Sequence, residues 1–126
     1  MPGMFMSELI VSPVPMRARF WRLWSSLVFI CEDGRVIDVP PDYETDLASI
    51  PAFIRGAIPV NGLHREAAAL HDFLYSTQGY TRAEADGIFH EAMIACGVGE
   101  FKARIFYWGV RAGGWLRWYS VAGNSK

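Results

Sequence analysis

A histidine and an aspartate stand side by side in an apolar stretch in the second half of the chain. His71 and Asp72 lie between the run AAAL (residues 67–70) and the pair FL (residues 73–74). Two ionisable side chains in such a segment need partners, because an unpaired buried charge is costly. Tyr75 follows His71 by one helical turn, so imidazole, carboxylate and phenol can cluster on one side of a helix.

A second aspartate, Asp86, lies on the next predicted helix. The connection between the two helices is short, which favours antiparallel packing and lets His71 and Asp72 face Asp86. A histidine held by one carboxylate can act as a general base, and a second carboxylate beside it can hold a metal. The alternative is a buried polar network that only locks the two helices together. The residue types alone leave both interpretations open.

Two further polar residues, Asp46 and Ser49, lie in a turn-rich segment before these helices. One interpretation is structural, with Thr45 or Asp46 capping a short helix. The other is that Asp46 and Ser49 point into the same site as His71. The chain has no G-x-S-x-G motif, so the serine lacks the sequence context of a nucleophile.

The residues before position 42 have the composition of strands and turns. Residues 25–31 and 35–39 are rich in β-forming residues, and Asp33-Gly34 between them is typical of a hairpin turn. Rough alternation over residues 17–24 predicts a further strand that leads into the hairpin.

The remainder has helical periodicity and helix end signals. The first predicted helix covers residues 65–76, and the second covers residues 82–96. Thr81 and Glu84 form a capping box in front of the second helix, and Gly97 is suited to the position after its end.

A third helix, predicted over residues 100–119, carries an apolar stripe. The stripe consists of Phe101, Ile105, Trp108, Ala112, Trp115 and Tyr119. Such a stripe normally packs into the core. Trp108, Trp115 and Trp118, together with the basic residues of this helix, also have the composition of a surface that docks on a lipid or a membrane.

At 126 residues, with 52% hydrophobic residues, the chain has the size and composition of one globular domain. We predict an α+β fold in which a small N-terminal antiparallel β-hairpin or sheet packs on three C-terminal α-helices. Its expected parts are an irregular N-terminal segment (1–16), a β-rich segment (17–41), a structured loop (42–63) and a helical part (64–119).

The charge balance argues against nucleic acid as a partner. Twelve basic and thirteen acidic residues give a net charge of −1, whereas nucleic-acid-binding domains carry a basic excess. The first sixteen residues lack the basic and apolar regions of a signal peptide, and no apolar run is long enough to span a membrane.

Three motifs in this order resemble domain-of-unknown-function family 1353. They are DYETDLASIP from residue 42, ALHDFLY from residue 69 and RAEADGIF from residue 82, and the resemblance covers roughly residues 17–118. Members of that family are mostly encoded by tailed bacteriophages and prophages. The resemblance therefore implies a phage origin, but no established activity. Together with the lack of a signal peptide, this predicts a location in the host cytoplasm or in the virion.

A local resemblance suggests a chemistry. The pattern His-Asp-Phe-x-Tyr over residues 71–75, followed by an aspartate on an antiparallel helix, is similar to the core of phospholipases of the A-2 type. The resemblance implies that His71 activates a water, that Asp86 orients His71, that Asp72 binds calcium, and that Tyr75 supports the network. Calcium would then stabilise the oxyanion formed when water attacks an ester.

Two functions follow from these patterns. The first is a small phage-encoded hydrolase that acts on an ester, such as a phospholipid, at His71, Asp72 and Asp86. The second is a non-enzymatic phage component, such as a virion or tail accessory or a protein that binds a phage or host partner. In the second case the polar cluster is structural and the aromatic C-terminal surface is a protein interface.

Overall fold

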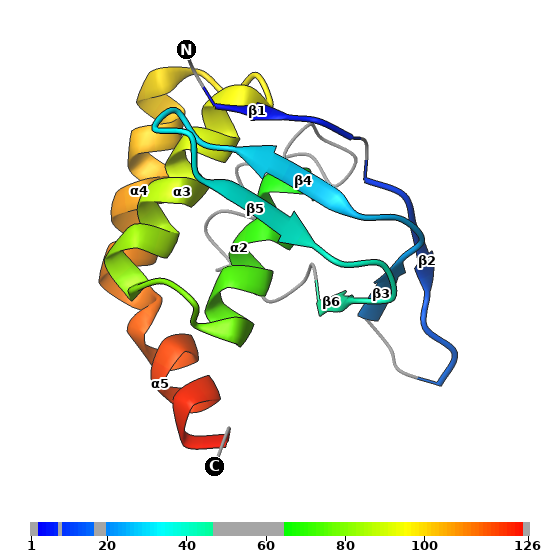
Figure 1. Cartoon of the computed structure of the whole chain (residues 1–126). Helices are drawn as coiled ribbons and strands as arrows, with labels where there is room; N and C mark the ends of the chain where they lie inside the picture. Colours follow the sequence, from blue (N-terminus) through cyan, green and yellow to red (C-terminus); the bar gives the residue numbers. More distant parts are fainter. Residues whose placement is uncertain (1–2, 8, 17–19, 47–64, 125–126) are drawn as a thin grey trace.

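The structure, a computed structural model, describes residues 3–7, 9–16, 20–46 and 65–124 of the chain. Short antiparallel strands occupy the N-terminal part and α-helices occupy the C-terminal part (Figure 1). The predicted α+β class is therefore confirmed.

The predicted hairpin supplies two of the three strands of one sheet. It consists of β4 (Leu27–Ile30) and β5 (Val36–Val39), and β1 (Met4–Phe5) pairs with the other edge of β4. Gly34 in the connecting turn has a φ of +92°, a left-handed conformation that glycine adopts without a steric penalty. The pair Asp33-Gly34 therefore predicted the turn of this hairpin correctly.

A second sheet has the order β2-β3-β6, with β2 at Val11–Pro13, β3 at Phe20–Leu23 and β6 at Glu44–Asp46. The prediction of an irregular segment over residues 1–16 was wrong, because β1 and β2 both lie in it. Strands of two or three residues are too short to leave a periodic pattern, and pairing with a longer neighbour defines them. The register of β3 against β6 places Thr45 opposite Trp21.

Four helices follow in the described part of the chain: α2 (Arg65–Thr77), α3 (Arg82–Ala95), α4 (Glu100–Gly113) and α5 (Trp115–Asn124). The prediction of one continuous helix over residues 100–119 was wrong, because the helix is interrupted at Gly114. Two successive glycines lower helix stability at this point. None of the helices in the described ranges has the length and hydropathy needed to cross a lipid bilayer.

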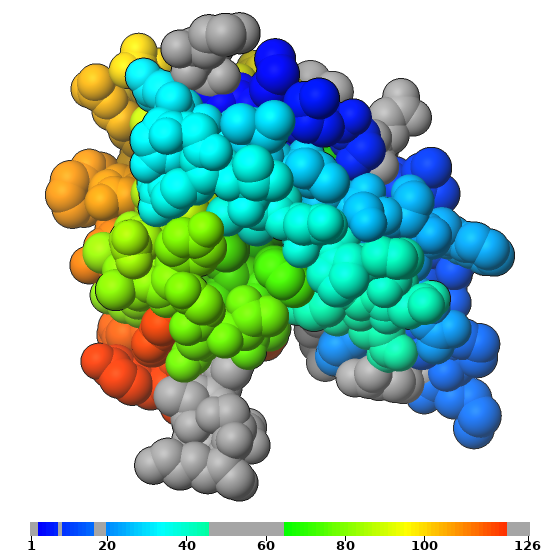
Figure 2. Space-filling view, viewed as in Figure 1, coloured from blue at the N-terminus to red at the C-terminus, as the bar shows by residue number. Residues whose placement is uncertain are grey.

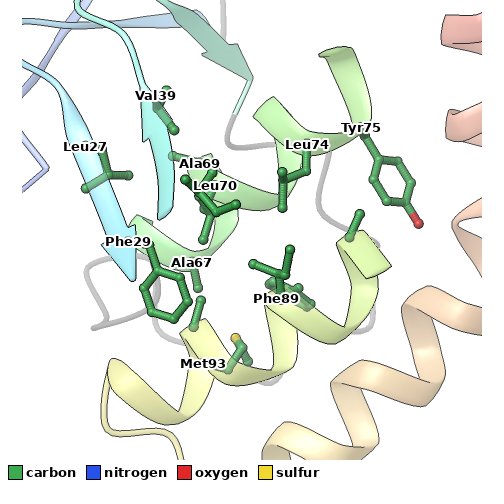
Figure 3. Packing of buried hydrophobic residues seen from close by; sticks show 14 of the residues in the cluster. Leu27, Phe29, Val39, Ala67, Ala69, Leu70, Leu74, Tyr75, Phe89 and Met93 are labelled. Carbon is green, nitrogen blue, oxygen red and sulfur yellow. The ribbon is translucent and has the colours of Figure 1, made fainter. Parts of the chain in front are cut away.

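The core lies between the sheets and the pair α2–α3. In Figure 3, Leu27, Phe29 and Val39 project from the hairpin toward Leu70 on α2 and Met93 on α3, and all five side chains are buried. The surface of the hairpin (cyan) is continuous with that of α2 and α3 (green) in the space-filling view (Figure 2). α4 packs on the other side of α3.

α4 faces the core with a different stripe from the one expected. It buries Ala103, Phe106 and Val110 and leaves Phe101 80% and Trp108 66% exposed. The prediction that the stripe from Phe101 to Tyr119 packs into the core was therefore wrong. Both sets of apolar residues have helical spacing, so periodicity alone does not select the buried one.

The capping box at the start of α3 is present as predicted. The backbone N–H of Glu84 donates to Thr81 Oγ1 (3.1 Å), and the backbone N–H of Thr81 donates to Glu84 Oε1 (2.9 Å). Thr81→Ala should lower the free energy of unfolding by about 1 kcal/mol, because the backbone N–H of Glu84 loses its side-chain acceptor. Chemical denaturation of this variant beside Thr77→Ala, which changes another exposed threonine, measures the effect. Equal losses in the two variants would contradict a capping contribution.

Candidate functional site

The buried carboxylate of Asp86 is the centre of a polar cluster between helices. Asp86 has no exposed surface. Its oxygen Oδ1 accepts a hydrogen bond from the Tyr75 hydroxyl at 2.7 Å and lies 2.9 Å from His71 Nε2. The sequence predicted that His71 and Tyr75 lie on one face of their helix, and that face points to Asp86. α2 thus supplies two polar side chains to one oxygen of a carboxylate on α3.

Two arginines contact the second oxygen of the same carboxylate. Arg111 on α4 places Nη1 3.2 Å from Asp86 Oδ2, and Arg82 places Nη1 3.5 Å from it. Arg82 also donates to the backbone carbonyls of Val110 and Arg111 at the end of α4. The Asp86 cluster is therefore a junction of three helices. Its members are Asp86, His71, Tyr75, Arg82 and Arg111.

The surroundings keep Asp86 ionised. Burial by itself would raise the pKa of this carboxyl, but the hydrogen bonds from His71 and Tyr75 outweigh burial and lower the pKa below its usual value. Burial, followed by the hydrogen bond to Asp86, raises the pKa of the Tyr75 phenol, so Tyr75 remains a donor. An ionised carboxylate only accepts hydrogen bonds, and this assigns the proton on neutral His71 to Nε2 and leaves Nδ1 as the basic atom.

The His71 ring lies between two aromatic rings. Its centroid is 4.3 Å from that of Tyr75 and 4.5 Å from that of Phe89. The side chain is still 15% exposed, whereas Asp86 is fully buried. A fixed, partly exposed imidazole with a buried carboxylate behind it is the usual arrangement of a histidine that exchanges protons.

Asp72 lies in a second cluster and does not contact Asp86 directly. Its Oδ1 accepts from Arg117 Nη2 at 2.8 Å, and its Oδ2 accepts from Thr45 Oγ1 at 2.8 Å and from the Tyr43 hydroxyl at 3.2 Å. Adjacent residues on a helix point about 100° apart, so His71 and Asp72 diverge toward different neighbours. The Asp72 cluster joins α2 to β6, the strand that contains Thr45, and to α5, the helix that contains Arg117.

The start of α5 lies against the Asp86 cluster. The Trp118 ring packs edge-on against the Tyr75 ring, with centroids 5.1 Å apart. The backbone carbonyl of Trp118 accepts a hydrogen bond from the side-chain amide of Gln78. Gly114, at the break between α4 and α5, is buried against the Tyr75 hydroxyl. The helix break therefore brings Trp118 and the neighbouring Arg117 back toward α2.

Two predicted site residues lie outside what the structure describes. Ser49 falls in the segment 47–64, and the side chain of Asp46 is likewise not described, although its backbone belongs to β6. Whether these residues join the clusters stays a prediction. Among the described residues, no group of three or more histidine, cysteine, aspartate and glutamate side chains is arranged to hold a metal ion.

Comparison with known sequences assigns the family. Residues 21–110 match the family described as "Protein of unknown function (DUF1353)". The chain belongs to this family. It is also similar to an "Uncharacterized protein y4jT" of Sinorhizobium fredii (strain NBRC 101917 / NGR234), with 32% identity over 92 residues. That match covers 71% of the chain and 27% of y4jT, so the chain spans about a quarter of its relative. No solved structure matches.

The sequence of this DUF1353 chain did not reveal the arginines that pair with Asp86 and Asp72. Arg82 precedes Asp86 by four residues on the same helix, and this spacing was a usable signal for an ion pair. Arg111 and Arg117 reach their carboxylates over 25 and 45 residues of chain. No local pattern marks such pairs, because the packing of separate helices creates them.

Proposed function

We propose that this DUF1353 protein hydrolyses an ester by water attack, with His71 Nδ1 as the general base. The contact between His71 Nε2 and the buried, ionised Asp86 carries the proposal. It fixes the tautomer and the orientation of the imidazole and stabilises the imidazolium that forms when the histidine takes a proton.

In the proposed reaction, Nδ1 removes a proton from a water as its oxygen attacks the ester carbonyl carbon. The imidazolium then gives this proton to the leaving alkoxide as the bond to the carbonyl carbon breaks. Asp86 stays ionised throughout, because Tyr75, Arg82 and Arg111 supply compensating donors and charge. Proton transfer by a positioned side chain typically contributes 10²–10⁴-fold to a rate.

The described residues around Asp72 do not fit the calcium ion that the phospholipase resemblance implies. Calcium takes six to eight oxygen ligands, whereas both oxygens of Asp72 already accept hydrogen bonds, one of them from Arg117. We therefore propose a reaction that does not depend on calcium. Arg117, which is paired with Asp72, has a side chain that is 42% exposed.

The test compares ester hydrolysis by the wild type with that by His71→Ala. Release of p-nitrophenol from short-chain esters and of fatty acid from anionic phospholipid vesicles measures neutral and anionic substrates separately. We expect His71→Ala to lower the rate at least ~100-fold on the substrates that the wild type cleaves. Cooperative thermal unfolding of the variant confirms that it is folded.

His90→Ala is the matched control, because His90 lies on α3 outside the Asp86 cluster and packs against Tyr107. We expect it to retain the wild-type rate. Equal rates for the wild type and folded His71→Ala would contradict the proposal, as would a folded wild type that cleaves none of these esters. Either result would favour the interpretation of the cluster as a structural network.

The alternative proposal is a non-enzymatic phage component that binds a phage or host protein. The outward aromatic residues of α4 and α5 support it, since exposed aromatic residues are enriched at protein interfaces. A lipid or membrane surface is the other partner that these residues would suit. Co-purification with a virion or a host protein would favour the alternative, and hydrolysis that depends on His71 would favour the enzyme.

A further inference from the structure

α4 has two apolar faces, and only one of them is covered by described residues. Ala103, Phe106 and Val110 pack into the core. Phe101, Ile105 and Trp108 lie on the opposite side of the helix and are exposed. A helix that is apolar on two sides requires packing on both to remove its apolar surface from water.

The spacing of the outward residues is that of a helix-pairing seam. Phe101, Ile105, Trp108 and Ala112 follow one another at intervals of four, three and four residues. Alternating intervals of three and four are the pattern with which one helix packs its side chains between those of a second helix. The natural occupant of this face is therefore another helix.

The exposed apolar area is large enough for a stable association. Six outward apolar side chains of α4 and α5 are exposed, namely Phe101, Ile105, Trp108, Trp115, Leu116 and Tyr119. From their exposed fractions, the three that lie in the seam (Phe101, Ile105 and Trp108) present about 400 Å² of apolar surface. Each partner in a standard interface contributes about 800 Å² of total surface, of which a little over half is apolar.

We propose that α4 is the interface of a homodimer, in which it pairs antiparallel with α4 of a second copy of this chain. A two-fold axis between Ile105 and Trp108 places Phe101 of each copy against Ala112 of the other. Large side chains then lie opposite small ones at the ends of the seam, which suits an ordinary distance between helices. Parallel pairing would instead place Phe101 against Phe101 and Trp108 against Trp108.

The charges around the seam favour a second copy over an anionic membrane. Attraction to such a membrane depends on basic side chains that are free to face it. Arg111 is paired with Asp86, and Arg104 is paired with Glu100. Lys102 is then the one basic side chain of α4 for which the described part of the chain shows no carboxylate partner. The seam itself carries no charge, as expected for the core of a protein interface.

Sedimentation equilibrium of the full chain at micromolar concentrations tests the proposal. We expect the wild type to have the mass of two chains, and Phe101→Glu with Ile105→Glu to weaken dimerisation at least ~100-fold, because central apolar residues dominate interface energies. Phe101→Glu alone serves as the second variant, since Phe101 has the highest exposure in the seam. Trp24→Glu is the matched control, because Trp24 is also exposed but lies just after β3, and it should remain dimeric.

A wild type that stays monomeric up to ~100 µM would overturn the proposal. Equal dimerisation by the wild type and the folded seam variants would overturn it as well. Co-sedimentation of a monomeric wild type with anionic phospholipid vesicles, lost in Phe101→Glu, would assign this face to a membrane instead. None of these outcomes depends on ester hydrolysis, so the dimer and the proposed activity succeed or fail separately.

Discussion

Asp86→Asn should lower the free energy of unfolding by about 3–5 kcal/mol, the range for removal of one partner from a buried ion pair. The substitution keeps the shape of the side chain but removes its charge. Arg82 and Arg111 then lack the carboxylate that compensates them, and the Tyr75 hydroxyl loses a charged acceptor. For a domain of this length, the expected fall in melting temperature is on the order of 10–20 °C.

Chemical denaturation at pH 7 measures this effect, with Glu100→Gln as the control. Glu100 also pairs with an arginine, but both side chains of that pair are mostly exposed, and exposed pairs contribute little to stability. The control should therefore unfold almost as the wild type does. A loss in Asp86→Asn no larger than that in Glu100→Gln would show that the buried cluster does not hold the three helices together.

The difference in stability between the wild type and Asp86→Asn should also depend on pH. The pKa of Asp86 is lowered in the folded state, so its stabilising contribution is present above the unfolded pKa of about 4 and is lost as the pH falls through the lower folded value. The stability difference between the wild type and Asp86→Asn should thus shrink below about pH 4. A difference that grew on acidification would contradict the lowered pKa.

Gly114→Ala should destabilise the protein by about 3 kcal/mol through overpacking. A β-carbon at this position would overlap the Tyr75 hydroxyl and the carbonyl of Val110. Tyr75 is fully buried, so it can yield only by giving up its hydrogen bond to Asp86. We expect a lower melting temperature and a lower rate of any hydrolysis that depends on His71, because the same carboxylate orients that histidine.

Gly113→Ala is a control one residue away. The space around a β-carbon at Gly113 is open to 4 Å, and alanine stabilises a helix relative to glycine by up to about 1 kcal/mol. In thermal unfolding, the melting temperature of Gly113→Ala should therefore equal or exceed that of the wild type. The melting temperature of Gly114→Ala should be well below it. Equal melting temperatures for the two variants would exclude close packing of α5 against Tyr75.

Part of the candidate site followed from the sequence. Spacing on one helix placed His71 and Tyr75 on a common face, and a short connection brought Asp86 opposite to it. The expectation that Asp72 shares this face was wrong, since its carboxylate contacts Arg117, Thr45 and the Tyr43 hydroxyl. A step of one residue turns a side chain through about 100°, and which neighbour it then meets depends on packing.

The sequence by itself determined the features that rest on neighbouring residues. The hairpin around Gly34, the capping box at Thr81 and the starts of α3 and α4 all depend on contacts within a few residues, and all are present. In these elements the local hydrogen bonds and backbone preferences agree with the overall fold, so local patterns suffice to predict them.

Only the tertiary structure decided which apolar face of α4 is buried, where the long helix breaks, and which arginines neutralise the buried carboxylates. Both faces of α4 have the period of a helix, and the cation at Asp72 comes from a residue 45 positions away. Such choices depend on how all the elements pack together and on which charges that packing brings into contact. They are properties of the packed chain, and no short segment contains them.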